Sequence, residues 1–200
     1  MKKSSASGSL NIGSKHLRII STRSTPRSLH LMQDPKIIAI ILAAGKGSRF
    51  GMPKVDAVFG GITFLERIRN TLTTAGISEI FVARDLPTSD MLESLQYAAQ
   101  HTSAAAGYLI FPVDHPFVNA ATIVEMVSTF NLHPNAVIRP LYEARTGHPI
   151  IIPACLDLWM PNVTGGLAQI IRQSGVEVLN MPTPDQGVLR NINTAADIGL

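Results

Sequence analysis

The segment 42–54 has the sequence LAAGKGSRFGMPK, which holds three glycines and three basic residues. Glycine lets a backbone turn tightly and come close to a ligand, and successive backbone N–H groups in such a turn form a concave site for anions. Lys46, Arg49 and Lys54 add positive charge around the turn, and a guanidinium offers phosphate two parallel hydrogen bonds. The pattern predicts a loop that binds a polyphosphate.

The glycine spacing separates this loop from two other phosphate-binding patterns. A Walker loop requires G-x-x-x-x-G-K-[ST], and the segment has no Gly-Lys-Ser/Thr at that spacing. A dinucleotide loop requires G-x-G-x-x-G, whereas Gly45, Gly47 and Gly51 follow G-x-G-x-x-x-G. An ordinary glycine-rich turn after a strand remains the alternative.

A carboxylate and an amide in later segments could hold a metal ion. Asp114 lies in FPVDHPF, between two prolines, and Mg²⁺ prefers oxygen ligands of this kind. Asn193 lies in NINTAAD and offers a neutral, weaker oxygen. The alternatives are an aspartate that caps a turn and an asparagine that caps a terminal helix. We expect His115 to be a local hydrogen-bonding partner of its neighbours and not a catalyst.

The elements that must position these side chains alternate between strand-like and helix-like segments. Residues 36–44 form a continuous apolar run that is typical of a strand buried on both faces. Further strands are expected at 79–84, 107–113, 136–142, 148–152 and 176–180. Helices are expected at 62–75, 91–100, 166–173, after a cap at Asn119, and from 194 onward.

This alternation predicts an α/β fold, a three-layer α/β/α Rossmann-like domain with a mostly parallel mixed sheet. Ligands of such sheets bind beyond the carboxyl ends of the strands. The loops after Ala44 and Val113 both leave strand carboxyl ends, so we expect them to meet.

Composition and charge exclude several classes of protein. The hydrophobic fraction of 46% and the charged fraction of 16% suit one globular domain, and no apolar run approaches the roughly 20 residues of a membrane span. The single cysteine, Cys155, cannot form an internal disulfide, which favours a reducing cytoplasm. Residues 1–35 carry six basic residues and one acidic residue, which leaves 11 basic and 13 acidic residues in 36–200 and argues against a nucleic-acid partner.

The motif L-A-A-G-x-G-x-R-x-G-x-P-K resembles the signature of the MobA-like NTP transferase family, the nucleotidyltransferases of the molybdenum-cofactor type. The resemblance extends to P-x-D-x-P around Asp114 and to N-x-N-T-x-x-D at 191–197. It implies that 36–200 is a nucleotidyltransferase domain and that 1–35 is a disordered basic leader. A targeting peptide and a misassigned start codon are the alternatives for the leader.

The resemblance implies a role for each matching residue. Arg49 and Lys54 would neutralise the triphosphate and the leaving pyrophosphate, and with Asp114 they would be the catalytic residues. Asp114 and Asn193 would bind Mg²⁺, and Gly147 and His148, in a G-H-P triplet, would contact the acceptor; a hairpin turn is the alternative there. The nucleotide-binding residues would be Leu42, Ala43, Ala44, Gly45, Lys46, Gly47, Arg49, Lys54 and Ser94.

The implied reaction transfers NMP from an NTP to a phosphorylated acceptor and releases pyrophosphate. The resemblance favours CTP, with GTP as the other candidate, a molybdopterin-type acceptor, and interaction with a molybdoenzyme or its maturation factors; no nucleic acid or membrane partner is expected. A sugar- or alcohol-phosphate nucleotidyltransferase and a non-catalytic nucleotide-binding module remain alternatives. The family usually has a helix and a strand within the stretch that is only 85–106 here, where Ser94 and Leu95 would be the remnant of its Ser-Leu pair.

Overall fold

The computed structural model describes residues 36–43, 54–161 and 163–198, all within one compact unit of the chain, Gln33–Leu200. The expectation for a leader at 1–35 lies outside the described residues. So does most of the glycine-rich loop, including Ala44, Gly45, Lys46, Gly47 and Arg49. Leu42, Ala43 and Lys54, at the two ends of that loop, are described.

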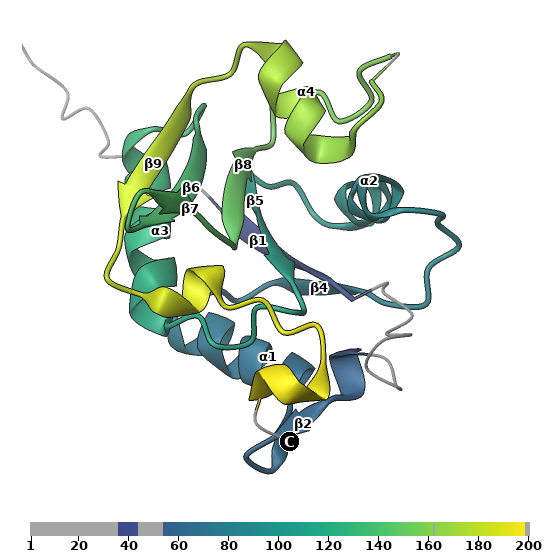
Figure 1. Ribbon diagram of the computed structural model, residues 1–200. Helices are drawn as coiled ribbons and strands as arrows, with labels where there is room; N and C mark the ends of the chain where they lie inside the picture. The colour runs from purple at the N-terminus through teal and green to yellow at the C-terminus, as the bar shows by residue number, and fades with distance from the viewer. Residues whose placement is uncertain (1–35, 44–53, 162, 199–200) are drawn as a thin grey trace, which may run out of the picture. The chain divides into compact units, whose positions relative to one another are not determined.

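Within the described residues, seven strands form one mixed sheet in the order β4-β1-β5-β8-β6-β7, with β9 paired to β6 (Figure 1). Strands β4, β1, β5, β6 and β9 run in one direction, while β8 and β7 run in the other. The sheet is therefore mixed and mostly parallel, as predicted. The strands are β1 Ile37–Leu42, β4 Ile80–Ala83, β5 Gly107–Pro112, β6 Val137–Tyr142, β7 Arg145–Thr146, β8 Ile150–Pro153 and β9 Val178–Pro182.

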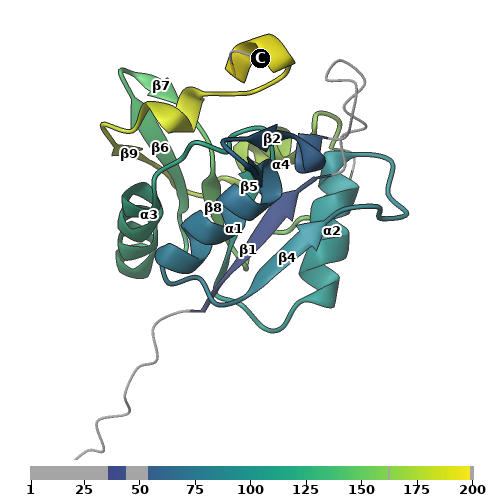
Figure 2. The same cartoon turned by 90° about the horizontal axis from the view of Figure 1, so that it is seen from below.

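Four α-helices of the described chain cover the two faces of this sheet (Figures 1 and 2). Helices α1 (Phe64–Thr74) and α3 (Ala120–Leu132) contribute to one hydrophobic core, while α2 (Met91–His101) and α4 (Gly166–Ser174) contribute to a second one. The two cores lie on opposite faces of the sheet, which confirms the predicted α/β/α layering.

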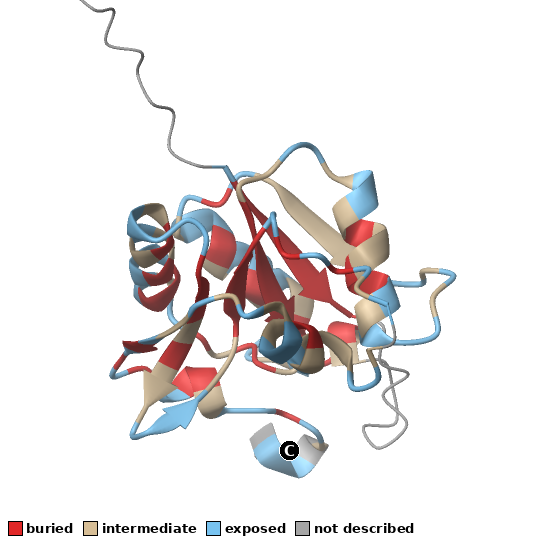
Figure 3. Cartoon of the chain, turned by 90° about the horizontal axis from the view of Figure 1, so that it is seen from above, coloured by how far each residue is buried: buried red, intermediate tan, exposed pale blue. Residues whose placement is uncertain are grey.

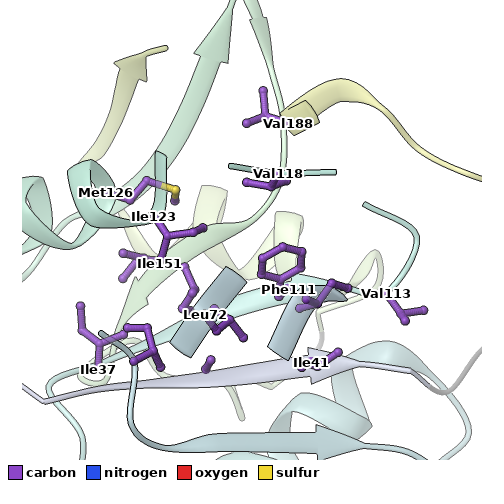
Figure 4. Close-up of a cluster of buried hydrophobic side chains, with 14 of the residues drawn as sticks. Ile37, Ile41, Leu72, Phe111, Val113, Val118, Ile123, Met126, Ile151 and Val188 are labelled. Atoms are coloured by element: carbon purple, nitrogen blue, oxygen red, sulfur yellow. The ribbon is translucent and has the colours of Figure 1, made fainter. Parts of the chain in front are cut away.

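Strand β1 shows how the apolar run at 36–44 produces a central strand. All its residues are buried (Figure 3), and successive side chains of a strand point to opposite faces. Ile37, Ala39 and Ile41 therefore reach the core under α1 and α3, a part of which appears in Figure 4, while the alternate residues reach the other core. A strand that is apolar on both faces can occupy only the middle of a covered sheet.

The structure corrects the predicted start of the first helix. Residues 62–75 were expected to be helical, but Ile62–Thr63 form strand β3, which pairs with β2 (Val58–Phe59), and α1 begins at Phe64. Thr63 and Glu66 form a capping box in which the Thr63 hydroxyl accepts from the Glu66 N–H, and the Glu66 carboxylate accepts from the Thr63 N–H. This reciprocal cap fixes the boundary.

The expectation that the Asn119 side chain caps the next helix is also wrong. Asn119 occupies the N-cap position of α3, but its side chain makes no capping hydrogen bond. The buried carboxylate of Asp185 serves that end, because it accepts from the Asn119 backbone N–H and from the Thr122 hydroxyl, each at 2.8 Å. The helix expected from 194 onward is a short 3-10 helix, η3 (Ala195–Ile198). The other described 3-10 helices are η1 Lys54–Asp56 and η2 Gln186–Leu189.

Candidate nucleotide and metal site

The parallel pairing of β1 and β5 brings the two predicted loops together. Leu42 lies opposite Pro112 in the register of the pair, and the Val113 N–H donates to the Leu42 carbonyl over 3.1 Å. The chain therefore leaves both strands at the same edge of the sheet. That edge is where an α/β sheet binds its ligands.

Asp114 follows β5 and has a partner on each carboxylate oxygen. Oδ1 lies 2.8 Å from Nδ1 of the buried His115, and Oδ2 lies 3.4 Å from the Lys54 ammonium. Burial raises the pKa of Asp114, but the hydrogen bond and charge of His115 and the charge of Lys54 outweigh that effect and lower the pKa overall. The carboxylate is therefore held ionised at neutral pH, and the side-chain contact of His115 is the local one that was predicted.

Asn193 reaches the same place from the far end of the chain. Its Oδ1 accepts a hydrogen bond from the Lys54 ammonium over 2.7 Å. The segment is attached to the site by the Ile192 N–H, which donates to the Asp114 carbonyl over 2.7 Å. The N–H groups of Asn193 and Thr194 donate to Asp197, so the carboxylate of Asp197, and not the Asn193 amide, satisfies this turn.

The ammonium of Lys54 thus contacts both side-chain oxygens that were expected to bind Mg²⁺, one from Asp114 and one from Asn193. Oxygens of Asp114 and Asn193 that converge on one cation are a donor set that fits a hard divalent ion. Among the described residues, no group of three or more His, Cys, Asp or Glu side chains could hold a metal. A metal here would therefore take its remaining ligands from water and triphosphate oxygens, as Mg²⁺ usually does.

Gly147 and His148 border the other side of this site. A Cβ added at Gly147 would lie 2.3 Å from the Val188 carbonyl oxygen, so only glycine fits there. The His148 N–H donates to that same carbonyl over 2.9 Å, and its ring lies 4.9 Å from the His115 ring. Burial and the neighbouring His115 lower the pKa of His148 to about 4, against the opposing charge of Asp114, so this ring is neutral at pH 7.

Ser94 is not brought to this group of residues. It is fully buried in the first turns of α2, where its hydroxyl pairs with the Thr88 hydroxyl at 2.7 Å and donates to the Asp90 carbonyl. Its neighbour Leu95 lines a cavity, whereas Ser94 does not. The predicted contact of Ser94 with the nucleotide stays a prediction.

The sequence analysis missed the residue that holds the short helix carrying Lys54. Arg84, which directly follows β4, makes a two-pronged ion pair with Asp56 of η1, with both N–O distances at 2.9 Å. Arg84 was read only as the end of a strand. An arginine at the carboxyl end of a strand, close to a predicted ligand site, was the available signal.

Two cavities adjoin the site. The smaller has a volume of about 400 Å³ and is lined by Asp114, His115 and His148, among others. The larger, of about 930 Å³, lies against the sheet face that α2 and α4 cover. Met91, Pro112, Thr146, Gly147 and His148 line both cavities.

In the part of the chain that the structure describes, no helix has the length and apolar character needed to cross a membrane.

The chain was compared with known protein families and with curated proteins. The sequence model of the family described as "MobA-like NTP transferase domain" matches residues 39–178. A search of curated proteins finds no significant match.

Solved structures share the fold at low sequence identity. Rv0371c from Mycobacterium tuberculosis H37Rv has a TM-score of 0.68 at 19% identity, over 83% of this chain and 96% of its own. The same protein in complex with manganese has a TM-score of 0.60 at 16% identity, over 76% and 89%. A 4-diphosphocytidyl-2C-methyl-D-erythritol synthase from Anaerococcus prevotii DSM 20548 has a TM-score of 0.66 at 14% identity, over 83% and 96%.

Proposed function

The chain belongs to the MobA-like NTP transferase domain family, and from this membership we propose that it transfers a nucleotidyl group from an NTP to a small phosphorylated acceptor. The observation that carries the proposal is the meeting of Lys54, Asp114 and Asn193 at the carboxyl edge of the sheet. These residues come from three distant segments, each of which resembles a family motif in the sequence; Lys54 and Asp114 lie within the matched residues 39–178, and Asn193 lies outside them. Their convergence supports a common role at one phosphate group.

In the proposed reaction, a phosphate oxygen of the acceptor attacks the α-phosphorus of the NTP in line. The new P–O bond forms as the bond to the β-phosphate breaks, and pyrophosphate leaves with the electron pair. A phosphate is already anionic at neutral pH, so the step needs no strong general base. Positioning and neutralisation of charge supply the rate enhancement. Lys54 would act on the triphosphate, together with Arg49 of the undescribed part of the loop.

The side-chain oxygens of Asp114 and Asn193 suit a divalent cation, and we propose that they hold Mg²⁺. When bound, it would neutralise negative charge on the phosphates. His115 fixes one carboxylate oxygen of Asp114, and the low pKa of Asp114 keeps the carboxylate available for a cation. The manganese complex of the structurally similar mycobacterial protein is consistent with a divalent ion.

The finer identity of the substrates rests on the sequence motifs. We propose CTP as the donor, with GTP as the second candidate, and a molybdopterin-type acceptor that lies near Gly147 and His148. A maturation factor of a molybdoenzyme would then be a partner, and the cytoplasm the compartment. The structurally similar synthase from Anaerococcus prevotii keeps a sugar- or alcohol-phosphate acceptor as an alternative. A nucleotide-binding module without turnover is a third possibility.

The test is a pyrophosphate-release assay over CTP, GTP, ATP and UTP, with Mg²⁺ and candidate phosphorylated acceptors. Asp114→Ala should lower turnover by about a hundredfold or more, since a metal contributes several kcal/mol to the transition state. Asp157→Ala is the matched control, because Asp157 only accepts a bond from the Trp159 N–H in an exposed turn. Tight NTP·Mg²⁺ binding without any pyrophosphate release would favour the non-catalytic module, and near-normal turnover by Asp114→Ala would contradict the site assignment.

A further inference from the structure

The larger cavity is lined mainly by hydrocarbon side chains. Its lining includes residues of β1, β5, β6, β8 and β9 of the sheet, among them Leu42, and residues of α2 and α4. Its volume of about 930 Å³ is at the upper end of the range for small-molecule sites. The apolar lining includes Leu95, Ile110, Ile150, Leu167, Ile171 and Val178.

This cavity opens directly onto the proposed transfer site. Pro112, two residues before Asp114, lines both cavities, and so do Gly147 and His148. A molecule that fills the larger cavity would therefore have one end beside Asp114. The Nδ1 atom of His148 is buried and has no hydrogen-bond partner among the described residues, so a polar atom of a ligand could satisfy it.

Three charged side chains, those of Asp90, Arg139 and Arg172, are also part of the lining. Arg139 bonds through Nε and Nη2 to the Asn180 amide oxygen, and Arg172 bonds to the Gln169 amide oxygen. Neither guanidinium contacts a carboxylate within the described residues. The carboxylate of Asp90 accepts the Glu93 N–H at the start of α2. Thr146 and His148 are the other polar side chains of the lining, and the remaining lining side chains are hydrocarbon apart from the thioether of Met91.

We propose that this cavity holds the body of the acceptor, and that the acceptor is a phosphate ester whose body is predominantly apolar. The inference rests on the proposed nucleotidyl transfer, and it disfavours the molybdopterin-type acceptor, because a pterin ring carries hydrogen-bonding groups around its edge. A sugar phosphate would bury several hydroxyl groups against a mainly hydrocarbon wall, and each hydroxyl left unpaired costs roughly tenfold or more in affinity. An aromatic or hydrocarbon body would gain from burial against the same wall.

The test uses two probes of opposite character, 2-naphthyl phosphate and glucose 6-phosphate, and measures binding by calorimetry to the full chain with Mg²⁺ and a non-hydrolysable CTP analogue. We expect 2-naphthyl phosphate to bind at least tenfold more tightly than glucose 6-phosphate. Leu167→Trp places a bulky side chain in the cavity and should weaken 2-naphthyl phosphate by tenfold or more. Gln173→Trp is the matched control, because Gln173 is an exposed residue of the same helix that does not line the cavity.

The outcomes separate this inference from the proposed function. Equal weakening by both tryptophan variants, or tighter binding of glucose 6-phosphate, would overturn the apolar pocket. If Leu167→Trp abolished binding of the CTP analogue but left binding of 2-naphthyl phosphate unchanged, the cavity would belong to the nucleotide. That result would also overturn the inference. If Leu167→Trp fails to fold, Arg139→Gln gives a second measurement. This variant should lower the affinity for a naphthyl phosphate with a distal carboxylate more than the affinity for 2-naphthyl phosphate itself. Failure of wild-type protein to bind the CTP analogue would instead count against the proposed function.

Discussion

The Lys54 ammonium donates a hydrogen bond to the Asn193 amide oxygen over 2.7 Å, although 139 positions separate the two residues in the sequence. The contact joins the end of the glycine-rich loop to the last described segment of the chain. Through Lys54 it also brings that segment to Asp114, whose Oδ2 is 3.4 Å from the same ammonium. In the proposed metal site, Lys54 and the metal would share the oxygens of Asp114 and Asn193. The affinity for the metal should therefore depend on the charge of the oxygen that residue 193 supplies.

Replacing Asn193 should change metal affinity in a direction set by charge. Asn193→Asp adds a negative oxygen to the set and should tighten Mn²⁺ binding about tenfold, while Asn193→Ala should weaken it by a similar factor. Titration with Mn²⁺ in the presence of an NTP measures both effects. Asn135→Asp, which adds the same charge at an exposed position outside the site, should leave the affinity unchanged. A decrease in affinity for Asn193→Asp would contradict the ligand role.

Breaking the ion pair between Arg84 and Asp56 should impair turnover more than stability. An exposed ion pair contributes at most about 1 kcal/mol to folding, but this one holds η1, whose first residue is Lys54. We expect Arg84→Ala to lower kcat roughly five- to tenfold with little change in Tm. Arg84→Lys should recover little, because a lysine cannot form both bonds.

A double-mutant cycle is the sharper test of this pair. Arg84→Ala combined with Asp56→Ala should cost no more than Arg84→Ala alone, because both variants break the same ion pair; Arg84→Ala also removes the contact of Nε with Asp85, which is 3.1 Å away. Additive losses in kcat would show that Arg84 acts by another route, such as direct contact with the nucleotide.

His148 should make stability depend on pH in the acid range. Its pKa is about 4 in the folded chain and 6.5 by reference, so the unfolded chain binds the proton more readily between these values. The free energy of unfolding should therefore fall as pH drops from about 6.5 to about 4, by at most about 3 kcal/mol from this group. Urea titrations of wild type and His148→Gln across this range should show a shallower slope for the variant. Identical slopes would mean that the ring titrates normally.

Asp185 should be worth more to stability than its sequence context suggests. Its buried carboxylate accepts three hydrogen bonds at 2.8 Å, from the Asn119 N–H, the Thr122 hydroxyl and the Gly187 N–H. Asp185→Ala should lower the free energy of unfolding by about 2–4 kcal/mol, because it leaves buried donors unpaired. Asn119→Ala should cost less than about 0.5 kcal/mol, since that side chain makes no cap. Chemical denaturation compares the two, and similar losses would contradict the assignment.

Local patterns accounted for the layers of the fold. The apolar run at 36–44 predicted a central strand because burial on both faces demands such a sequence. The helix expected at 91–100 forms as α2, and the Asp90 side chain caps it by accepting the N–H of Glu93, the third helical residue. The carboxyl-edge rule then predicted that the segments after β1 and β5 would meet.

Interactions between distant segments were beyond the sequence pattern. Asn119 has the right residue type and occupies the N-cap position of α3, but the carboxylate of Asp185, 66 residues later in the chain, accepts the hydrogen bonds at that helix end. Arg84 pairs with Asp56 for the same reason. Ser94 matches a family motif, yet its hydroxyl is occupied by Thr88 and Asp90 within the described structure. A motif specifies a residue type, whereas the direction of a side chain depends on tertiary packing.

The position of Asp185 also has a consequence for how the molecule opens. One carboxylate joins the first turn of α3 to Gly187, and the chain then runs a few residues to Ile192 and its bond with the Asp114 carbonyl. These contacts follow one another along the chain. The first turn of α3 and the segment 187–193, which carries Asn193, should therefore unfold as one cooperative unit. Slow, matched exchange of the Gly187 and Ile192 amide protons would be its signature, and a protein partially unfolded at α3 would also have lost Asn193, the proposed metal ligand, from the site.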